Sequence, residues 1–292
     1  MRSNRTAIAS SGPAMRYARV VAVAVVAALL ITVNLVLTSR SLGAIAAGAP
    51  AVDWIQYVEA SRRLDGEELY AVTDTYAYHY SPILAGVFGL LAPVGAIGWR
   101  MLHLLGALAM PTWPLRIATL ASWPFWYDTE AGNVLVFVVL AAAWAIRGNP
   151  IGTGAYFLLL VTVPRPLMIP VAVWLLWRRP QWRVPFAALF SIHAIAVLAT
   201  GWGDGWVAAM LAAADDVSNP SNIGPSRLVG TAPWLLVGLP LAAWLTWKGR
   251  LGLASLAASP YWLPYYLLVL LLELPQRFWS SAKVRLSGPA AS

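Results

Sequence analysis

The sequence predicts an all-α, polytopic integral membrane protein. Of its 292 residues, 60% are hydrophobic and only 11% are charged, whereas soluble domains average about 25% charged residues. Long apolar runs separated by short basic segments recur along the whole chain. The length accommodates about eight to ten transmembrane or half-spanning helices. Because no polar stretch is long enough for a separate soluble domain, we expect one membrane domain over residues 1–292.

The basic balance of the chain, a net charge of +8, fits the same fold class. The Lys and Arg residues stand between apolar runs, as the positive-inside rule describes for cytoplasmic loops. Neither a basic helix nor an aromatic RNA-binding motif accompanies them, so we expect membrane lipids and no nucleic acid as partners. The absence of cysteine from this chain excludes disulfides, thiolate metal sites and cysteine nucleophiles within it.

The chain begins with a predicted first membrane crossing. Residues 1–19 carry four arginines and no acid, which predicts a cytoplasmic tail, and residues 20–37 are almost wholly apolar. This run is longer than the apolar core of a signal peptide, so we expect a retained span, with cleavage near Ala47-Gly48-Ala49 as the alternative. Residues 39–80 hold six of the twelve acids and form the predicted first extracytoplasmic loop. Within this loop, apolar residues at helical spacing predict a short amphipathic surface helix over 51–64.

The middle of the chain is interrupted by prolines. Several apolar stretches within 81–146 are too short to cross a bilayer alone, and such half-spanning helices are tolerated where they pack on protein or line a cavity. The topology of 97–130 stays open. Residues 151–177 predict a hairpin that turns at Pro164-Arg165-Pro166, with Arg165 near its outer apex.

The remaining elements are assigned on the assumption that successive spans cross the membrane in opposite directions. We expect a span over 184–200, a second extracytoplasmic loop over 201–227, a returning span over 229–247, a last hairpin over 251–276 and a cytoplasmic tail over 277–292. Nine of the twelve acids fall in the two loops assigned to the outside, which agrees with this orientation. The predicted location is the plasma (inner) membrane, with multiple crossings.

The first outer loop holds the densest set of chemically useful side chains. Asp53 lies on the predicted surface helix, at the depth of a lipid headgroup. Partial desolvation there raises a carboxyl pKa toward the range of a general base, whereas the simpler interpretation is a cap at the helix N-terminus. The forked N–H donors of Arg62 and Arg63 suit a phosphate group.

Aromatic and imidazole side chains follow in the same loop. Tyr57, Tyr78 and Tyr80 could cover the face of a sugar ring. His79 could contact a substrate, although an interfacial histidine in water is the alternative. The three histidines of the chain make no spaced metal motif, so we expect no metal site and no other cofactor. A divalent ion that bridges Asp53 and a lipid phosphate stays an alternative.

The order and spacing of these residues resemble glycosyltransferase family 87, in the C-type superfamily of polyprenyl-phosphate-mannose-dependent alpha-mannosyltransferases and their relatives. The resemblance runs from about residue 16 to residue 276. It rests on five segments that stand in the order of the family motifs: Asp53-Trp54-Ile55-Gln56-Tyr57, Arg63-Leu64-Asp65-Gly66, Tyr78-His79-Tyr80-Ser81-Pro82, Arg165-Pro166 and Ser259-Pro260-Tyr261-Trp262-Leu263-Pro264-Tyr265-Tyr266. Where the family has Gly-Gln-x-Asn, this chain has Glu130-Ala131-Gly132-Asn133 and lacks the Gln.

The resemblance implies a membrane glycosyltransferase with Asp53 as its general base. Asp53 would deprotonate the hydroxyl of a lipid or glycan acceptor on the outer face of the membrane. That oxygen would attack the anomeric carbon of a hexose, expected to be mannose, on a polyprenyl-phosphate donor, and a single displacement would invert the configuration. Arg165 or Arg227 would stabilise the leaving phosphate, and Asn133 and Trp262 complete the expected substrate-binding set.

Simpler interpretations stay open for several of these residues. An arginine at membrane depth is costly unless it is paired or faces a polar cavity, and Arg165 could instead donate to a backbone carbonyl. Arg227 could be a solvated loop residue, and Asn133 a helix cap. Ordinary packing or solvation is expected for four further residues: His103, His193, Asp128 and Glu130.

Two other classes of function compete with an enzyme. A transporter or flippase also uses broken helices at membrane depth, but such proteins often show internal repeats and ionisable residues near the midplane. This chain has no repeat, and its charges gather at one predicted surface, which favours chemistry on a lipid-borne substrate. A non-catalytic envelope-assembly protein is the second alternative, because the Gly-Gln-x-Asn motif is altered.

Overall fold

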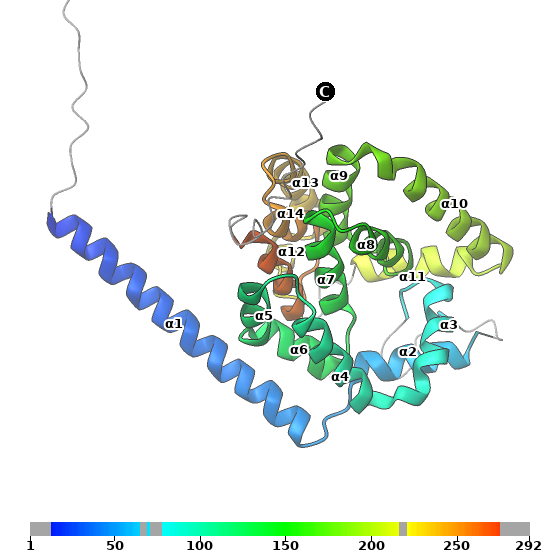
Figure 1. The fold of residues 1–292 in the computed structure, drawn as a ribbon, viewed down its shortest axis with the longest axis horizontal. Helices are drawn as coiled ribbons and strands as arrows, with labels where there is room; N and C mark the ends of the chain where they lie inside the picture. Colours follow the sequence, from blue (N-terminus) through cyan, green and yellow to red (C-terminus); the bar gives the residue numbers. More distant parts are fainter. Residues whose placement is uncertain (1–12, 65–68, 71–77, 216–220, 275–292) are drawn as a thin grey trace, which may run out of the picture.

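The computed structural model describes residues 13–64, 69–70, 78–215 and 221–274, and every regular element in these ranges is helical (Figure 1). The all-α prediction is therefore confirmed for the described part of the chain. The predicted tail 277–292 lies outside these ranges, as do the start of the 1–19 tail and parts of both predicted outer loops.

The helices of the first half follow in chain order: α1 (Pro13–Ala46), α2 (Val52–Arg62), α3 (Pro82–Leu91), the 3-10 helix η1 (Ala92–Val94), α4 (Gly95–Leu108), α5 (Trp113–Leu120), α6 (Trp123–Ala131) and α7 (Leu135–Ile146). Those of the second half are α8 (Pro150–Thr162), η2 (Pro166–Met168), α9 (Ile169–Arg178), η3 (Pro180–Trp182), α10 (Arg183–Ala199), α11 (Gly203–Asp215), α12 (Ser226–Val229), α13 (Thr231–Trp247), α14 (Leu251–Ala258) and η4 (Pro264–Glu273).

Among the described residues, three helical segments are long and apolar enough to cross a membrane: Tyr17–Ala46, Pro82–Leu108 and Pro180–Ala199. Most apolar side chains of α1 are exposed. The N-terminal end of this helix lies far from the other helices (Figure 1), whereas its later turns pack against α6. Several further apolar helices have 10–17 residues, which gives a length of about 15–26 Å against a hydrocarbon core of about 30 Å. These lengths match the expectation of half-spanning helices, and the pattern is that of a membrane protein.

Two boundaries differ from the sequence prediction. The first helix continues through 39–46, which we assigned to a loop, because this segment contains no proline. The helix ends before Gly48, where φ is +78°. The predicted outer loop over 201–227 contains α11, whose alanine-rich sequence has high helix propensity. A helix is present within the range 51–64, as α2, but it packs on the rest of the fold through the buried Trp54, Tyr57 and Ala60.

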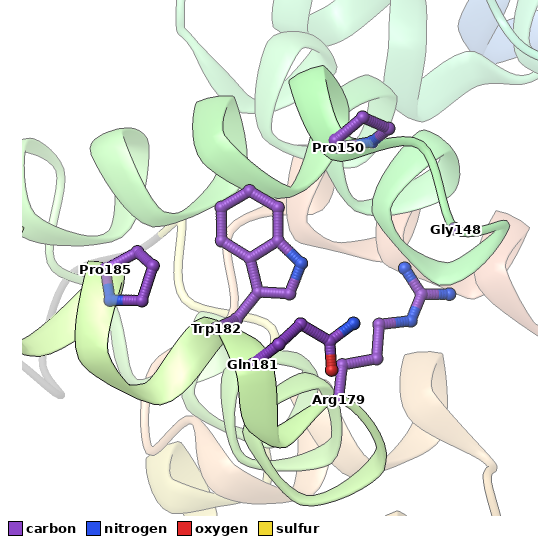
Figure 2. Close-up of a pocket in the computed structure, with 6 residues that line it drawn as sticks. All are labelled: Gly148, Pro150, Arg179, Gln181, Trp182 and Pro185. Carbon is purple, nitrogen blue, oxygen red and sulfur yellow. The ribbon is translucent and has the colours of Figure 1, made fainter.

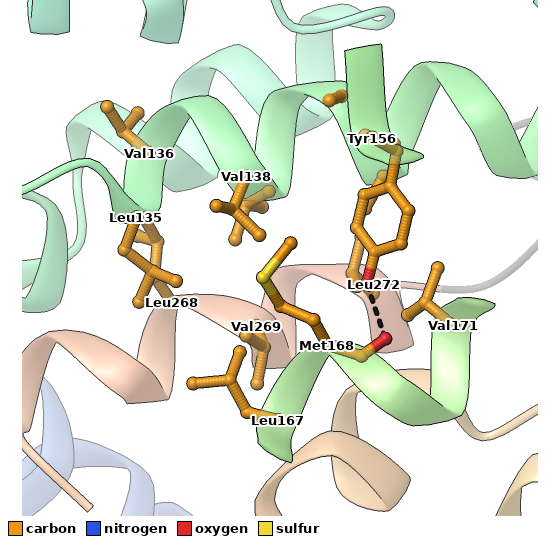
Figure 3. Packing of buried hydrophobic residues seen from close by; sticks show 14 of the residues in the cluster. Leu135, Val136, Val138, Tyr156, Leu167, Met168, Val171, Leu268, Val269 and Leu272 are labelled. Carbon is orange, nitrogen blue, oxygen red and sulfur yellow. Dashed lines mark hydrogen bonds between the residues drawn. The ribbon is translucent and has the colours of Figure 1, made fainter. Parts of the chain in front are cut away.

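The buried side chains form two main clusters that meet at one turn. The larger cluster joins α7, α8 and α9 with η4, and Figure 3 shows Tyr156 donating a hydrogen bond to the carbonyl of Met168, at 2.7 Å, in its interior. The smaller cluster is aromatic, and in it the indole of Trp54 stacks on that of Trp99 at 4.9 Å. Val134 belongs to the smaller cluster and Leu135 to the larger. The α6–α7 turn therefore lies at the junction between them.

A single polar side chain joins α1 to the rest of the described structure by hydrogen bonds. The amide nitrogen of Asn34 donates to the carbonyl of Ala121 at 2.8 Å, and its oxygen accepts from the backbone N–H of Trp123 at 2.8 Å. These two backbone groups lie at the break between α5 and α6, where helical partners are missing. The Asn34 side chain therefore supplies the hydrogen-bond partners that the helix ends lack, and it holds α1 against this break.

We predict that Asn34→Ala lowers the stability of the protein by about 1–2 kcal/mol, because it leaves a carbonyl and an N–H without partners. Thermal unfolding in detergent measures the effect. Thr38→Val is the matched control one turn further along α1, since the Thr38 hydroxyl has no hydrogen-bond partner among the described residues. Equal melting temperatures for the Asn34 variant and the wild type would contradict the prediction.

Candidate active site

Asn133 occupies the centre of a polar cluster at the junction of the two hydrophobic clusters. Its amide nitrogen donates to the Asp53 carboxylate at 2.5 Å and to the Tyr265 hydroxyl at 3.2 Å. Its amide oxygen accepts from the backbone N–H of Val134 at 2.8 Å and from the Arg165 guanidinium at 3.2 Å. Both donors and both acceptor positions of the amide are thus used. The orientation of the amide is therefore fixed, because a flipped amide would turn its oxygen toward the carboxylate.

The turn before Asn133 allows α2 to approach closely. Gly132 has φ +74°, and a Cβ at this position would lie 3.0 Å from the Cβ atoms of Ala51 and Trp54. Only glycine combines that backbone conformation with that separation at low cost. The Trp99 indole donates to the Gly132 carbonyl at 2.8 Å, and the buried Arg100 joins the same segments by donating to the carbonyls of residues 49, 129 and 130. Asp53 reaches Asn133 because its helix lies against this turn.

Arg165 brings a buried positive charge to the cluster. It precedes Pro166 in an extended conformation, and its side chain is 8% exposed. One terminal nitrogen, Nη2, donates to Asn133, while Nη1 is buried without a hydrogen-bond partner among the described residues. A buried guanidinium with an unused donor is costly. This donor is therefore available to an anionic ligand.

Three tyrosine rings surround the guanidinium. The Arg165 Cζ lies 5.1 Å from the ring centroid of Tyr80, 5.3 Å from that of Tyr266 and 5.9 Å from that of Tyr265. The faces of aromatic rings attract a cation within about 6 Å. The Tyr57 hydroxyl donates to the Tyr80 hydroxyl at 3.4 Å, which links this wall to α2. The wall partly compensates the buried charge without neutralising it.

The carboxylate of Asp53 is half-buried in the first turn of α2. Burial raises its pKa above the ordinary value, and this effect outweighs the hydrogen bond from Asn133 and the charge of Arg165, which lower the pKa. The N-cap residue of α2 is Ala51, so the simple interpretation of Asp53 as a side-chain cap does not hold. The Asp53 carboxylate accepts its hydrogen bond from the Asn133 amide instead.

A second pair of titratable groups lies behind Asn133. The two ring nitrogens of His103 contact the carbonyls of Trp99, at 2.9 Å, and of Asn133, at 2.6 Å. Nε2 also lies 3.7 Å from the Asp128 carboxylate, and both side chains are fully buried. Asp128 accepts from the N–H of Val136 at 3.0 Å, and burial raises its pKa to about 8. This pair holds the backbone on both sides of Asn133.

The structure brings together five of the residues predicted from the sequence. They are held by the direct hydrogen bonds and ring contacts described above: Asp53, Tyr57, Tyr80, Asn133 and Arg165. The two arginines at the other end of α2 do not join them. Arg62 is exposed, Arg63 is half-buried, and the nine to ten residues that separate them from Asp53 correspond to about 14 Å along the helix.

Four other predicted residues lie around the cluster or apart from it. Tyr78 is buried and supports the wall, because its ring packs edge-on against Tyr80 at 5.7 Å. The backbone carbonyl of His79 accepts from the Trp206 indole at 3.2 Å. Trp262 and the exposed Arg227 belong to a separate group around Asn222, whose side chain accepts from the Trp262 N–H and whose carbonyl accepts from the Arg227 guanidinium.

Four residues of the site were not predicted from the sequence. Tyr265 and Tyr266 stand in the last family-like motif, from which only Trp262 was selected, and the adjacent tyrosine pair was the signal that could have found them. His103 was expected to be a packing residue and Asp128 a loop acid, because no local pattern joins two residues 25 positions apart. Among the described residues, no group of three His, Asp or Glu side chains could hold a metal ion.

We predict that Gly132→Ala destabilises the protein by at least about 1–2 kcal/mol, since alanine resists a positive φ and its Cβ would press on α2. Gly154→Ala is the matched control, because nothing lies within 4 Å of a Cβ at that helical position. Helix propensity should make this control neutral or more stable by up to about 1 kcal/mol. Thermal unfolding of both variants tests the difference, and equal stabilities would show that α2 does not require the glycine.

Comparison with known proteins adds no relative to this description. No protein-family model, curated protein or solved structure matches the chain. The resemblance to glycosyltransferase family 87 therefore stays an expectation from the motifs. Any function has to be inferred from the chemistry of the cluster itself.

Proposed function

We propose that this chain is a multi-pass glycosyltransferase of the plasma (inner) membrane. It would transfer a hexose, with mannose as the first candidate, from a polyprenyl-phosphate donor to a lipid or glycan acceptor on the outer side. One observation carries the proposal: the Asp53 carboxylate and the partly unpaired Arg165 guanidinium both bind the Asn133 amide. A base and an anion-binding group are thereby held close together without neutralising each other directly.

The carboxylate suits the acceptor side of the reaction. A general base must be ionised and close to the hydroxyl that it deprotonates. Asp53 has one oxygen bound to Asn133, which leaves the other oxygen of a half-buried carboxylate for an acceptor hydroxyl. Its raised pKa increases its basicity relative to an ordinary aspartate.

The guanidinium suits the donor side. When the bond between the anomeric carbon and the phosphate oxygen breaks, negative charge moves onto the phosphate. The unused Nη1 donor of Arg165 supports binding of that charge at a buried position, where an electrostatic interaction is stronger than in water. The tyrosine rings around it offer apolar faces to a sugar or to the first isoprene unit.

The proposed step is a single displacement. The acceptor oxygen forms a bond to the anomeric carbon as its proton moves to Asp53. The bond from that carbon to the phosphate oxygen breaks, and polyprenyl phosphate leaves with the electron pair, stabilised by Arg165. The configuration at the anomeric carbon is inverted. Asp53 then releases its proton to water.

We predict that Asp53→Asn lowers sugar transfer by about 10²–10⁴-fold, the usual contribution of a general base. The assay uses the purified full chain in nanodiscs and measures transfer of radiolabelled sugar from polyprenyl-phosphate-mannose to a membrane lipid extract. Glu59→Gln is the matched control, because Glu59 lies on the same helix and has no role in the proposed step. Its activity should equal that of the wild type.

The outcomes separate the competing functions. Equal transfer by the wild type and the Asp53→Asn variant would remove Asp53 from the mechanism. If the wild type transfers no mannose, the glucose and arabinose donors are tested next. Failure with all three donors would overturn the proposal and favour a transporter or an envelope-assembly protein.

We predict that Arg165→Gln lowers transfer by about 10²–10³-fold, as loss of a preorganised donor to a developing negative charge does elsewhere. Arg165→Lys keeps the charge but loses the forked geometry, so it should restore only part of the rate. Arg227→Gln is the control, because Arg227 is exposed and binds the Asn222 carbonyl. Full activity of Arg165→Gln would exclude Arg165 from phosphate binding.

The pH dependence tests the base independently. The rate should rise with pH as Asp53 loses its proton, with an apparent pKa above the ordinary aspartate value of about 3.9. Asn133→Ala removes the hydrogen bond that lowers this pKa, so the acidic limb of its rate profile should move to higher pH. An unchanged acidic limb would show that the rate reports another group.

A further inference from the structure

An open concavity lies at the end of the α7–α8 hairpin remote from the candidate active site. It is an open hollow of about 630 Å³, within the usual size range of ligand sites. Its walls come from the α7–α8 turn, the end of α9, η3 and the start of α10 (Figure 2). The lining residues are Gly148, Pro150, Arg179, Gln181, Trp182 and Pro185.

The helices that leave the candidate active site end at this hollow. Helix α7 begins two residues after Asn133 and ends at Ile146, one residue before the turn that forms the wall. Its 12 residues correspond to about 18 Å. Helix α9 begins shortly after Arg165 and likewise ends at the hollow. The hollow is therefore a separate site.

The hollow lies at the start of a helix that could cross a membrane. Gln181 and Trp182, which line the hollow, are the second and third residues of the candidate span Pro180–Ala199. Its first turns carry Arg183, and farther along it Phe190, Ile192 and Ile195 are exposed and apolar. Basic residues and tryptophan at the end of such a span are typical of the headgroup layer. The hollow therefore lies at the depth of lipid phosphates.

The charge of this region is not neutralised by described carboxylates. Arg178, Arg179 and Arg183 lie within six residues of one another. In the described ranges the ion pairs are His103–Asp128 and Arg250–Glu273, and neither involves these three arginines. Arg178 lies over the Trp177 ring at 4.8 Å, and Arg183 donates to the Leu176 carbonyl at 3.0 Å. A net positive charge therefore surrounds the hollow.

The Arg179 guanidinium is held at the rim of the hollow. Its Nη2 donates to the carbonyl of Ile146, the last residue of α7, at 3.0 Å. Gly148 has φ +97°, and a Cβ there would lie 3.4 Å from the same nitrogen. Figure 2 shows the guanidinium, the Gln181 amide and the Trp182 indole around one space, with the two proline rings at its edges. Polar donors thus stand beside apolar surface.

We propose that this hollow binds the phosphate headgroup of an anionic phospholipid of the surrounding bilayer. The guanidinium and the Gln181 amide would donate to the phosphate oxygens, and the Trp182 ring and the prolines would contact the glycerol and the first methylene groups. Basic pockets between helices at the membrane surface bind such headgroups. Lipid binding at this hollow does not depend on whether the chain is a glycosyltransferase.

Native mass spectrometry of the full chain in a neutral detergent tests the proposal. The delipidated protein is titrated with dioleoyl phosphatidylglycerol, with dioleoyl phosphatidylcholine and with inorganic phosphate. We expect the first phosphatidylglycerol to bind more tightly than phosphatidylcholine, and Arg179→Gln to weaken it about fivefold, as loss of one interfacial cation does. Arg178→Gln is the matched control. It removes the same charge one position away from Arg179, and Arg178 does not line the hollow.

Three outcomes would overturn the proposal. Equal weakening by the Arg178 and Arg179 variants would mean a diffuse surface charge. Equal binding of phosphatidylcholine would mean no recognition of the anionic headgroup. Binding of inorganic phosphate as tight as that of the lipid would mean a site for free anions. If Arg179→Gln does not fold, Gln181→Leu replaces it, since this change leaves the α7 contact intact, and unchanged lipid binding would then overturn the proposal.

Discussion

The structure of the candidate site depends on one amide that has no hydrogen-bonding capacity left. Asn133 connects a carboxylate 80 residues before it and a guanidinium 32 residues after it. The carboxylate needs a hydrogen-bond donor and the guanidinium needs an acceptor, and the amide side chain supplies both. An aspartate at this position would repel Asp53, and a leucine would leave a buried charge on each side without a partner. The neutral amide keeps opposite charges close without allowing a closed ion pair, which would consume the groups that a substrate needs.

Packing sets the position of that amide. Gly132 lets the backbone of α2 approach the turn, while the stacked rings of Trp54 and Trp99 fill the space beside it. On the other side, the buried pair His103 and Asp128 holds the turn through the Asn133 carbonyl and the N–H groups that follow it. A neutral imidazole has one N–H and can donate to only one of the two carbonyls that flank His103.

Part of this arrangement could be predicted from the sequence. The helical class follows from composition, and the motif order singled out Asp53, Asn133 and Arg165, which the structure joins. Tyr265 and Tyr266 stand out as an adjacent pair in the sequence, but the direction of their side chains could not be predicted, because they lie in the 3-10 helix η4, whose three-residue period differs from that of an α-helix. His103 and Asp128 could not be paired, because each lies in a different helix and only the packing of α4 against α6 brings them within 3.7 Å. Arg62 was selected for its charge alone, and its exposure shows that charge next to a motif does not define a site.

The helices that are too short to cross a bilayer are the ones that carry the site. Helix α7 begins and α8 ends beside the polar cluster, and the segments 132–134 and 163–165 are non-helical there. Non-helical backbone at membrane depth is tolerated only where protein buries it or a cavity receives it. In this fold the side chains of Asn133 and Arg165 lie at these two breaks, where the Asn133 amide oxygen accepts from the Val134 N–H and from the Arg165 guanidinium. A full-length span would have enclosed the same residues in a regular helix, whose backbone groups pair with one another. The interruptions of the helices therefore place the polar side chains of the cluster next to one another.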